Sequence, residues 1–138
     1  MRIAIFTHEF PALSETFVLN QVTGLLDQGH EVVVCANGQR DEPMTHADVV
    51  DYGLAERTIL LDLPRNPLMR ILKGTGLACR RLWREGPRAL LRCLDARRHG
   101  RFATSLRLLY WGERLAGQGS FDVILAHFGP LGQTAARL

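Results

Sequence analysis

Two short polar segments of the chain carry side chains that can contact a substrate. The first runs from His8 to Phe17, and the second runs from His127 to Gly132. Their imidazole, hydroxyl and carboxylate groups donate and accept hydrogen bonds, which suits a neutral ligand rich in hydroxyl groups, such as a sugar. Neither segment is a glycine-rich dinucleotide fingerprint or a phosphate-binding loop ending in Gly-Lys-Ser or Gly-Lys-Thr. A nucleotide pyrophosphate is therefore not expected to bind here.

The candidate residues in these segments are His127, which ranks first, and then Ser14, Glu15, Thr16, Gly129 and His8. His127 follows an apolar strand pattern, and binding sites concentrate where strands end. Three of these candidates also have an ordinary structural explanation. Ser14 suits a helix N-cap, worth about 1 kcal/mol, and Glu15 complements the positive end of a helix dipole, where it would repel a phosphate. His127 could instead be a strand-end histidine satisfied by the backbone, but we favour a functional role because sites concentrate where strands end.

Both segments follow predicted strands, at 2–7 and 121–126, and apolar runs at 32–36 and 58–62 predict two more. Between the first two strands, apolar residues recur with a helical period from Phe17 to Leu26, and Gly29 ends that helix. Strand, helix, glycine turn and strand form a βαβ unit, whose strands are parallel and whose crossover is right-handed.

The predicted fold class is α/β, an incomplete Rossmann-like parallel sheet of about four strands with flanking helices. Residues 37–52 are expected to be irregular, and 68–115 to form several helices. The glycines expected to interrupt those helices are Gly74, Gly76, Gly86 and Gly100. A doubly wound sheet usually has five or six strands, and it binds ligands outside the carboxyl ends of its strands. We therefore expect a fragment whose working loops follow the first and fourth strands.

Composition places the chain among soluble globular proteins, with 46% hydrophobic and 22% charged residues. The first residues lack the apolar core of a signal peptide, and no run approaches the ~18 apolar residues of a membrane-spanning helix. A cytoplasmic protein is predicted. The three cysteines are far apart and odd in number, so neither a disulfide framework nor a metal site is expected.

Charge is distributed unevenly along the chain. Residues 65–107 hold twelve Lys or Arg and two acidic residues, whereas the rest holds five basic and twelve acidic residues. This block suits a solvated face, a nucleic-acid surface or an anionic membrane surface. Apolar residues beside the arginines favour a peripheral membrane contact. No nucleic acid is expected, because the block lacks both aromatic interleaving beyond Trp83 and a recognisable nucleic-acid-binding motif.

Three motifs carry a family resemblance. They are Phe10-Pro-Ala-Leu-Ser-Glu-Thr-Phe17, Leu25-x-x-x-Gly29-His30-x-Val32, and Asp122-Val-Ile-x-Ala126-His127-Phe-Gly129. In this order and on these elements they resemble the N-terminal domain of family 4 glycosyltransferases. The first motif is most similar to bacterial exopolysaccharide transferases of the colanic-acid type. The middle of the chain, from about 37 to 120, is similar mainly in being basic and helical.

The resemblance implies a GT-B enzyme, in which two Rossmann-like domains face a cleft. Residues 1–138 would be the incomplete acceptor-side domain, with a basic helical insertion at about 65–117, and the C-terminal donor domain would be absent. Such enzymes transfer a sugar with retention of configuration and need no metal; their substrate is a nucleotide-sugar and no further cofactor is implied. Their paired glutamates lie in the C-terminal domain, so this chain alone is expected to be inactive.

The resemblance also assigns roles to residues and partners. It places a histidine at the position of His127 near the transferred sugar, with the turn from Ser14 to Thr16 on the floor of the cleft. The acceptor would be a polysaccharide or a lipid-linked saccharide in cell-envelope or exopolysaccharide biosynthesis. Lipid-linked acceptors lie at the inner face of the plasma membrane, which fits a membrane contact through residues 65–107.

An alternative function belongs to a different class. The chain would then be a non-catalytic α/β module whose basic helices dock on an anionic membrane or on nucleic acid.

Overall fold

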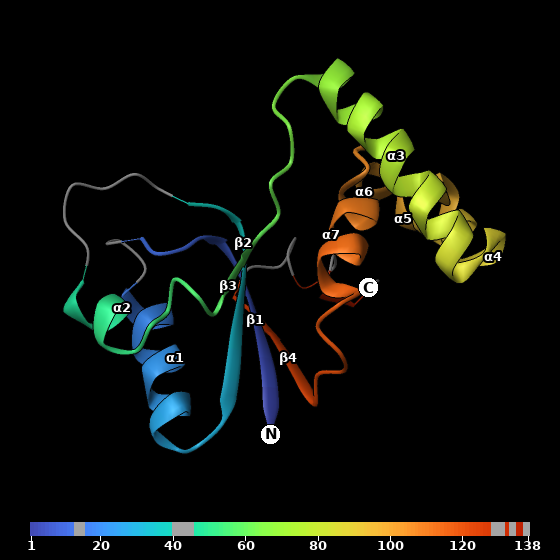
Figure 1. Ribbon diagram of the computed structural model, residues 1–138. Coiled ribbons are helices and arrows are strands. Elements are labelled where there is room, and N and C mark those ends of the chain that lie inside the picture. The colour runs from blue at the N-terminus through green and yellow to red at the C-terminus, as the bar shows by residue number, and fades with distance from the viewer. Residues whose placement is uncertain (13–15, 40–45, 128–131, 133–134, 137–138) are drawn as a thin grey trace. The chain divides into compact units, whose positions relative to one another are not determined.

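The computed structural model describes residues 1–12, 16–39, 46–127, 132, 135 and 136. Their contacts divide the chain into two compact units. The first unit joins Met1–Asp62 to Ser120–Ala135, and the second holds Leu63–Gly119 with Ala136–Leu138. Segments from the beginning and near the end of the chain thus build the first unit, while the second comes mainly from the middle of the sequence (Figure 1).

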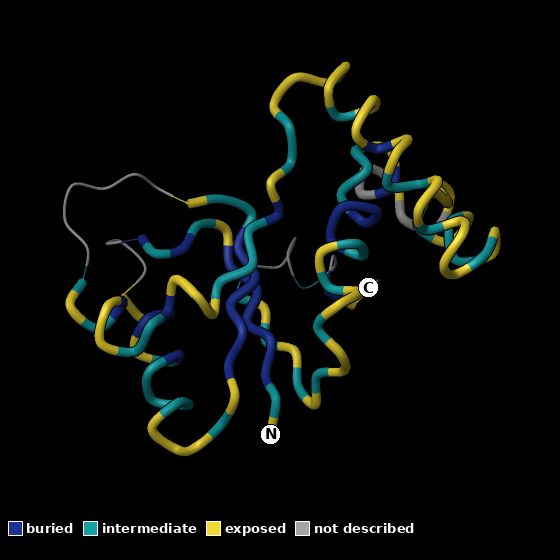
Figure 2. The backbone as a smooth tube through the Cα atoms, in the orientation of Figure 1, coloured by how far each residue is buried: buried dark blue, intermediate teal, exposed yellow. Residues whose placement is uncertain are grey.

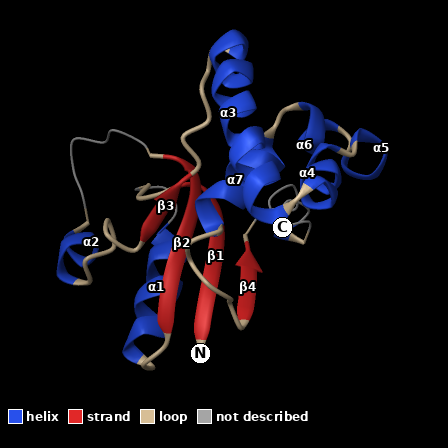
Figure 3. Cartoon of the chain, turned by 45° about the vertical axis from the view of Figure 1, so that its right-hand side comes forward, coloured by secondary structure: helices blue, strands red, loops and turns tan. Residues whose placement is uncertain are grey.

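The first unit is built on a parallel sheet whose strands lie in the order β3-β2-β1-β4 (Figure 3). The strands are β1 (Arg2–Glu9), β2 (Glu31–Gly38), β3 (Thr58–Leu60) and β4 (Val123–Ala126). All three pairings are parallel. The predicted fold class, a four-stranded parallel α/β half-domain, is confirmed. Strand order reverses beside β1, because β2 and β3 lie on one side of it and β4 on the other.

Helices α1 (Thr16–Asp27) and α2 (Ala47–Asp51) cover one face of this sheet (Figure 1). Val18 and Val22 of α1 and Val49 of α2 share a core with Ile5 and Val34 of the strands. Burying these apolar side chains is the main driving force for the layer. The expectation that residues 37–52 are irregular is wrong for Ala47–Asp51, which form α2. Val49 of this short helix is buried in the core, and the Tyr52 hydroxyl that follows it donates to Asp27 of α1 at 2.9 Å.

The turn between α1 and β2 is the predicted glycine stop. Gly29 has a φ of 79°, its N–H donates to the Leu26 carbonyl (2.9 Å), and the His30 N–H donates to the Leu25 carbonyl (3.1 Å). These two bonds form a Schellman motif, which satisfies carbonyls that the last helical turn leaves open. The βαβ connection is therefore fixed by local chemistry as well as by the core.

The second unit is helical, with breaks at two of the four predicted glycines. Its helices are α3 (Pro67–Glu85), α4 (Pro87–Leu94), α5 (Ala96–His99), α6 (Arg101–Thr104) and α7 (Arg107–Leu115). Gly86 and Gly100 end helices as predicted, but α3 continues through Gly74 and Gly76, so that part of the prediction is wrong. A Cβ on Gly74 would lie 2.9 Å from Leu106 Cδ1. This glycine therefore serves close packing.

The beginning of α3 and its contact with α7 are both held by hydrogen bonds. Asn66 caps the helix, because its Oδ1 accepts from the Leu68 N–H at 2.9 Å, and Pro67 occupies the first turn. The Tyr110 hydroxyl of α7 donates to the Arg70 carbonyl at 2.9 Å. No helix in the described part of the chain is long and apolar enough to cross a membrane.

Gly29 and Gly24 provide a matched test of the α1–β2 turn. Replacing Gly29 by Ala forces a Cβ into a left-handed conformation, so we expect a loss of about 1 kcal/mol in the free energy of unfolding. Gly24 lies inside α1, and the position that an alanine Cβ would take there has no neighbouring atom within 4 Å. Gly24→Ala should instead add up to about 1 kcal/mol through helix propensity. Denaturant unfolding, monitored by circular dichroism, measures the free energy of unfolding of both variants. Equal effects of the two substitutions would contradict the left-handed conformation of Gly29.

The cysteines differ in burial, and this predicts their reactivity. Cys35 in β2 is buried, which raises its pKa to about 12, whereas Cys79 is exposed. Because the thiolate is the nucleophile, we expect iodoacetamide to modify Cys79 in the folded protein and Cys35 only after unfolding. Mass spectrometry of the modified peptides, with and without urea, checks this order. Rapid modification of Cys35 in the folded protein would contradict the burial of its side chain in β2.

Candidate functional site

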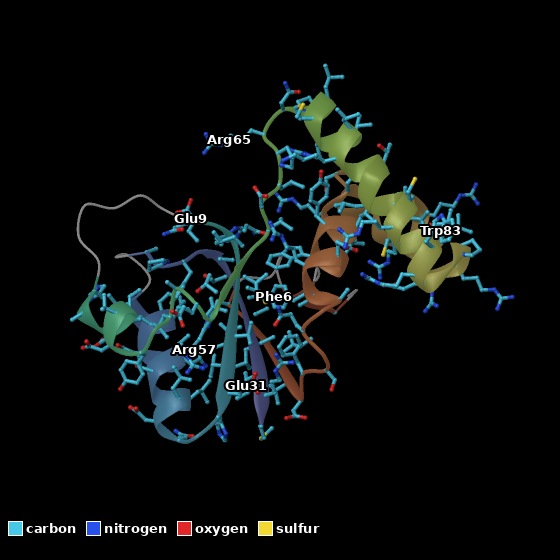
Figure 4. The ribbon with its side chains drawn as sticks, in the orientation of Figure 1. Phe6, Glu9, Glu31, Arg57, Arg65 and Trp83 are labelled. Atoms are coloured by element: carbon cyan, nitrogen blue, oxygen red, sulfur yellow. The ribbon has the colours of Figure 1, made fainter. Side chains whose placement is uncertain are left out.

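The candidate site lies where β1 and β4 end, at the point where strand order reverses. Ligands of open parallel sheets bind at this kind of position. Figure 4 shows Glu9 at this end of β1, and Glu31 at the opposite end of the sheet, where β2 begins. The first turn of α1 follows β1 in the chain and brings Thr16 and Phe17. The site is thus formed by two strand ends and one helix start.

His127 is positioned by the sheet itself. Its backbone N–H donates to the Phe6 carbonyl of β1 at 3.2 Å, which adds one further bond to the ladder between β1 and β4. Phe6 is 1% exposed, so this anchor is part of the core. The backbone of His127 is therefore held at the strand end, where the sequence pattern predicts it.

The imidazole of His127 packs against Phe17 from α1. Their ring centroids are 5.2 Å apart and the ring planes make an angle of 76°, an edge-to-face arrangement. Such aromatic pairs contribute about 0.5–1.5 kcal/mol beyond burial. The Phe17 side chain remains 51% exposed. The pair therefore presents an aromatic surface to solvent next to a hydrogen-bonding ring.

One polar atom of this pair lacks a partner. His127 Nε2 is buried and makes no hydrogen bond within the part of the chain that the structure describes. A buried polar atom left unpaired costs about 1–3 kcal/mol. A ligand hydroxyl that reached Nε2 would remove this cost, whereas an apolar ligand would not. The site therefore favours a ligand with hydroxyl groups.

The other predicted site residues differ in where they lie and in whether the structure describes them. Thr16 begins α1 and is exposed, and His8 is exposed near the end of β1. Both lie on elements that meet at this edge of the sheet. Ser14, Glu15 and Gly129 lie outside the described residues. Over the described ranges, no group of three or more His, Cys, Asp or Glu side chains is arranged to hold a metal ion.

Phe17 is the residue whose direction the helical period predicts wrongly. The period assigns it to the apolar face of the helix, but the structure leaves it half exposed and in contact with His127. Val18 is fully buried instead. Neighbouring helical residues point about 100° apart, so both cannot face the core equally. Helical side chains also lean toward the helix N-terminus, and this direction brings Phe17 toward the strand ends.

The Phe17–His127 contact can be tested without a ligand. Replacing Phe17 by Leu removes the ring current beside the imidazole, so we expect a change in the NMR resonances of the His127 side chain. Phe121→Leu is the matched control, because the Phe121 ring lies 4.9 Å from the Arg2 guanidinium, at the opposite end of the sheet. If both substitutions leave the His127 resonances unchanged, the contact is absent in solution.

Comparison with known proteins gives three relatives that match the whole chain. Two are the WcaL proteins of Salmonella typhimurium, 38% identical over 138 residues, and of Escherichia coli K12, 36% identical over 139 residues. Both are named as colanic acid biosynthesis glycosyltransferases. The third is the amylovoran biosynthesis glycosyltransferase AmsK of Erwinia amylovora, 32% identical over 142 residues. The chain spans 34% of the length of each.

Two further comparisons gave no match. No protein-family model matches the chain. No solved structure matches it.

Proposed function

We propose that this chain is the acceptor-side part of a glycosyltransferase that acts in cell-envelope or exopolysaccharide biosynthesis. The enzyme would be of the family 4, GT-B type. It would move a sugar, with retention of configuration, from a nucleotide-sugar to a polysaccharide or lipid-linked acceptor. Three relatives named as glycosyltransferases support this proposal. The observation that carries it is the buried Nε2 of His127, which has no hydrogen-bond partner among the described residues, beside the half-exposed Phe17.

This pair of side chains suits a sugar. A pyranose has C–H groups that can pack on an aromatic ring, and hydroxyl groups that can bond an imidazole nitrogen. In this proposal Phe17 supports the ring of the transferred sugar and His127 Nε2 bonds one of its hydroxyl groups. Thr16, together with Ser14 and Glu15, would contact the acceptor, and His8 and Gly129 would line the same edge.

The donor phosphates would be bound elsewhere. Glu9 lies at the end of β1, and its carboxylate would repel a diphosphate at this edge of the sheet. Glu15, which precedes α1 in the sequence, would add to this repulsion. We assign the leaving diphosphate to a second domain, outside these 138 residues. In the transfer, the bond from the anomeric carbon to the diphosphate oxygen breaks and its electron pair leaves with the diphosphate. The acceptor oxygen bonds the anomeric carbon, and the proton of the acceptor hydroxyl passes to the departing diphosphate. The chain alone would then hold substrate without completing the reaction.

His127 provides the main test of the proposal in the full-length enzyme. We expect His127→Ala to reduce sugar transfer by about 100-fold or more, in line with the loss of a positioned polar group at a reacting centre. The melting temperature should fall by only a few degrees. His30→Ala is the control, since His30 lies in the α1–β2 turn. Transfer of a labelled sugar and thermal unfolding are measured on the same preparations, and comparable losses in both would assign His127 a structural role only.

The alternative, a non-catalytic module, is favoured by the exposed apolar and basic helices of the second unit. The downstream reading frame separates the two functions. A downstream α/β domain with two glutamates seven residues apart would support the glycosyltransferase proposal. A reading frame that continues without such a domain would contradict that proposal.

A further inference from the structure

We propose that α3 and α4 form a docking surface for an anionic phospholipid bilayer. The surface comprises the outward side chains of residues 68–94. Only the purpose of this surface, which is to bring the enzyme to a lipid-linked acceptor, rests on the proposed function. The physical evidence for it lies in the second unit alone.

Helix α3 has three distinct faces. At about 100° per residue, Arg70, Gly74 and Arg81 fall on one face, which packs toward α7. Tyr110 bonds the Arg70 carbonyl, and Gly74 lies close to Leu106. The remaining two faces are an apolar arc and a basic arc.

The apolar arc is exposed. Leu68 is 75% exposed, Leu72 66% and Trp83 92%. On a helix these side chains cover an arc of about 120° together with Ile71 and Leu82, which are also exposed. Twelve large hydrophobic side chains are exposed over the described part of the chain, and eight of them lie on α3 and α4. Figure 2 shows that most positions along these two helices, of any residue type, are exposed. So much unburied apolar surface on two consecutive helices marks an interaction site.

The basic arc lies beside the apolar arc. On α3 it carries Lys73, Arg80 and Arg84. On α4 the exposed Arg88 and Arg92 lie together on one side of Leu91, which is 66% exposed. Arg80 and Arg84 pair with Glu113. Lys73, Arg88 and Arg92 make no ion pair with any residue that the structure describes. Their charges are therefore available to an anionic surface.

A shallow groove joins the two arcs near the end of α3. It is largely open to solvent and is lined by Cys79, Arg80, Trp83 and Arg84, all on α3. An indole beside two guanidinium groups matches a phospholipid headgroup, because the phosphate bonds arginine and the indole prefers the membrane interface. The ion pairs of Arg80 and Arg84 with Glu113 hold this side of the groove in place.

The pattern fits a bilayer better than other partners. A basic helix with apolar residues along one side lies in the plane of an anionic membrane, with the apolar arc in the acyl boundary and the cations at the phosphates. Nucleic acid would use the cations but leave Leu68, Leu72 and Leu91 unburied. A protein partner would have to be both apolar and strongly acidic. We therefore commit to the bilayer, and the other partners become outcomes of the test.

The first experiment measures the tryptophan fluorescence of the full-length protein. The contribution of Trp83 is the difference between the emission of this protein and that of a Trp83→Phe variant. Vesicles of phosphatidylcholine mixed with phosphatidylglycerol should shift this emission to shorter wavelength, and vesicles of phosphatidylcholine alone should not. Added salt should reverse the shift, because screening weakens charge attraction. An equal shift with both vesicles, or with an oligonucleotide, overturns the proposal.

The second experiment measures vesicle flotation of single variants. Leu72→Ser should lower partitioning by about tenfold, in proportion to the apolar area withdrawn from the membrane. Arg88→Gln and Arg92→Gln should each lower it about fivefold. The controls lie in the first unit: Val50→Ser, at a position that is 74% exposed, and Arg57→Gln should change partitioning less than twofold. Equal losses in controls and test variants overturn the proposal.

Shielding of Trp83 before lipid is added would also overturn the proposal. If Trp83 resists quenching by acrylamide without vesicles, another part of the protein covers it, and if that protection grows with protein concentration, a second copy does. The docking proposal and the enzymatic proposal can fail separately. His127→Ala should float as well as the unmodified protein, and Leu72→Ser should transfer sugar normally to a short water-soluble acceptor.

Discussion

The parallel pairing of β1 with two neighbours is the constraint on which the rest of the molecule depends. β1 bonds β2 from Arg2 to Glu9 and bonds β4 from Ile3 to Phe6. Its residues Ile3 to Thr7 are all buried, so the strand can only exist with its backbone groups paired on both sides. Because β2 continues to one side and β4 to the other, the end of β1 becomes the place where strand order reverses. The candidate site follows from that position.

A second contact set fixes the opposite end of the same strand. The Arg2 N–H donates to Asp122 at 2.7 Å, and its guanidinium pairs with Glu31 at 2.7 Å. Asp122, just before β4, and Glu31, the first residue of β2, are thereby held against the beginning of β1. Such exposed pairs contribute little stability individually. Their effect is on register, because a slip of one residue would separate them and also turn apolar side chains away from the core.

Local patterns in the sequence predicted the elements, while contacts between distant residues decided the details. The unbroken apolar runs of β1 and β2 and the Gly29 stop follow from chemistry within a few residues. The continuity of α3 through Gly74 depends on Leu106, which no local pattern links to it. The same applies to the site. The position of His127 after a predicted strand was enough to make it a candidate, but its contact with Phe17 could be predicted only once the order of the strands in the sheet was known. Predictions on Ser14, Glu15 and Gly129 fall outside the described residues.

The division of the chain has a consequence for how the protein is made. Three strands come from the first sixty residues, whereas β4 and His127 lie beyond Leu63–Gly119, the main segment of the second unit. During synthesis from the N-terminus, the first three strands can pair early, but β1 keeps one open edge until β4 has left the ribosome. Closing the long intervening loop costs only slightly more entropy than closing a short one, so the insertion is tolerated. The candidate site is therefore among the last parts of the first unit to form in a growing chain.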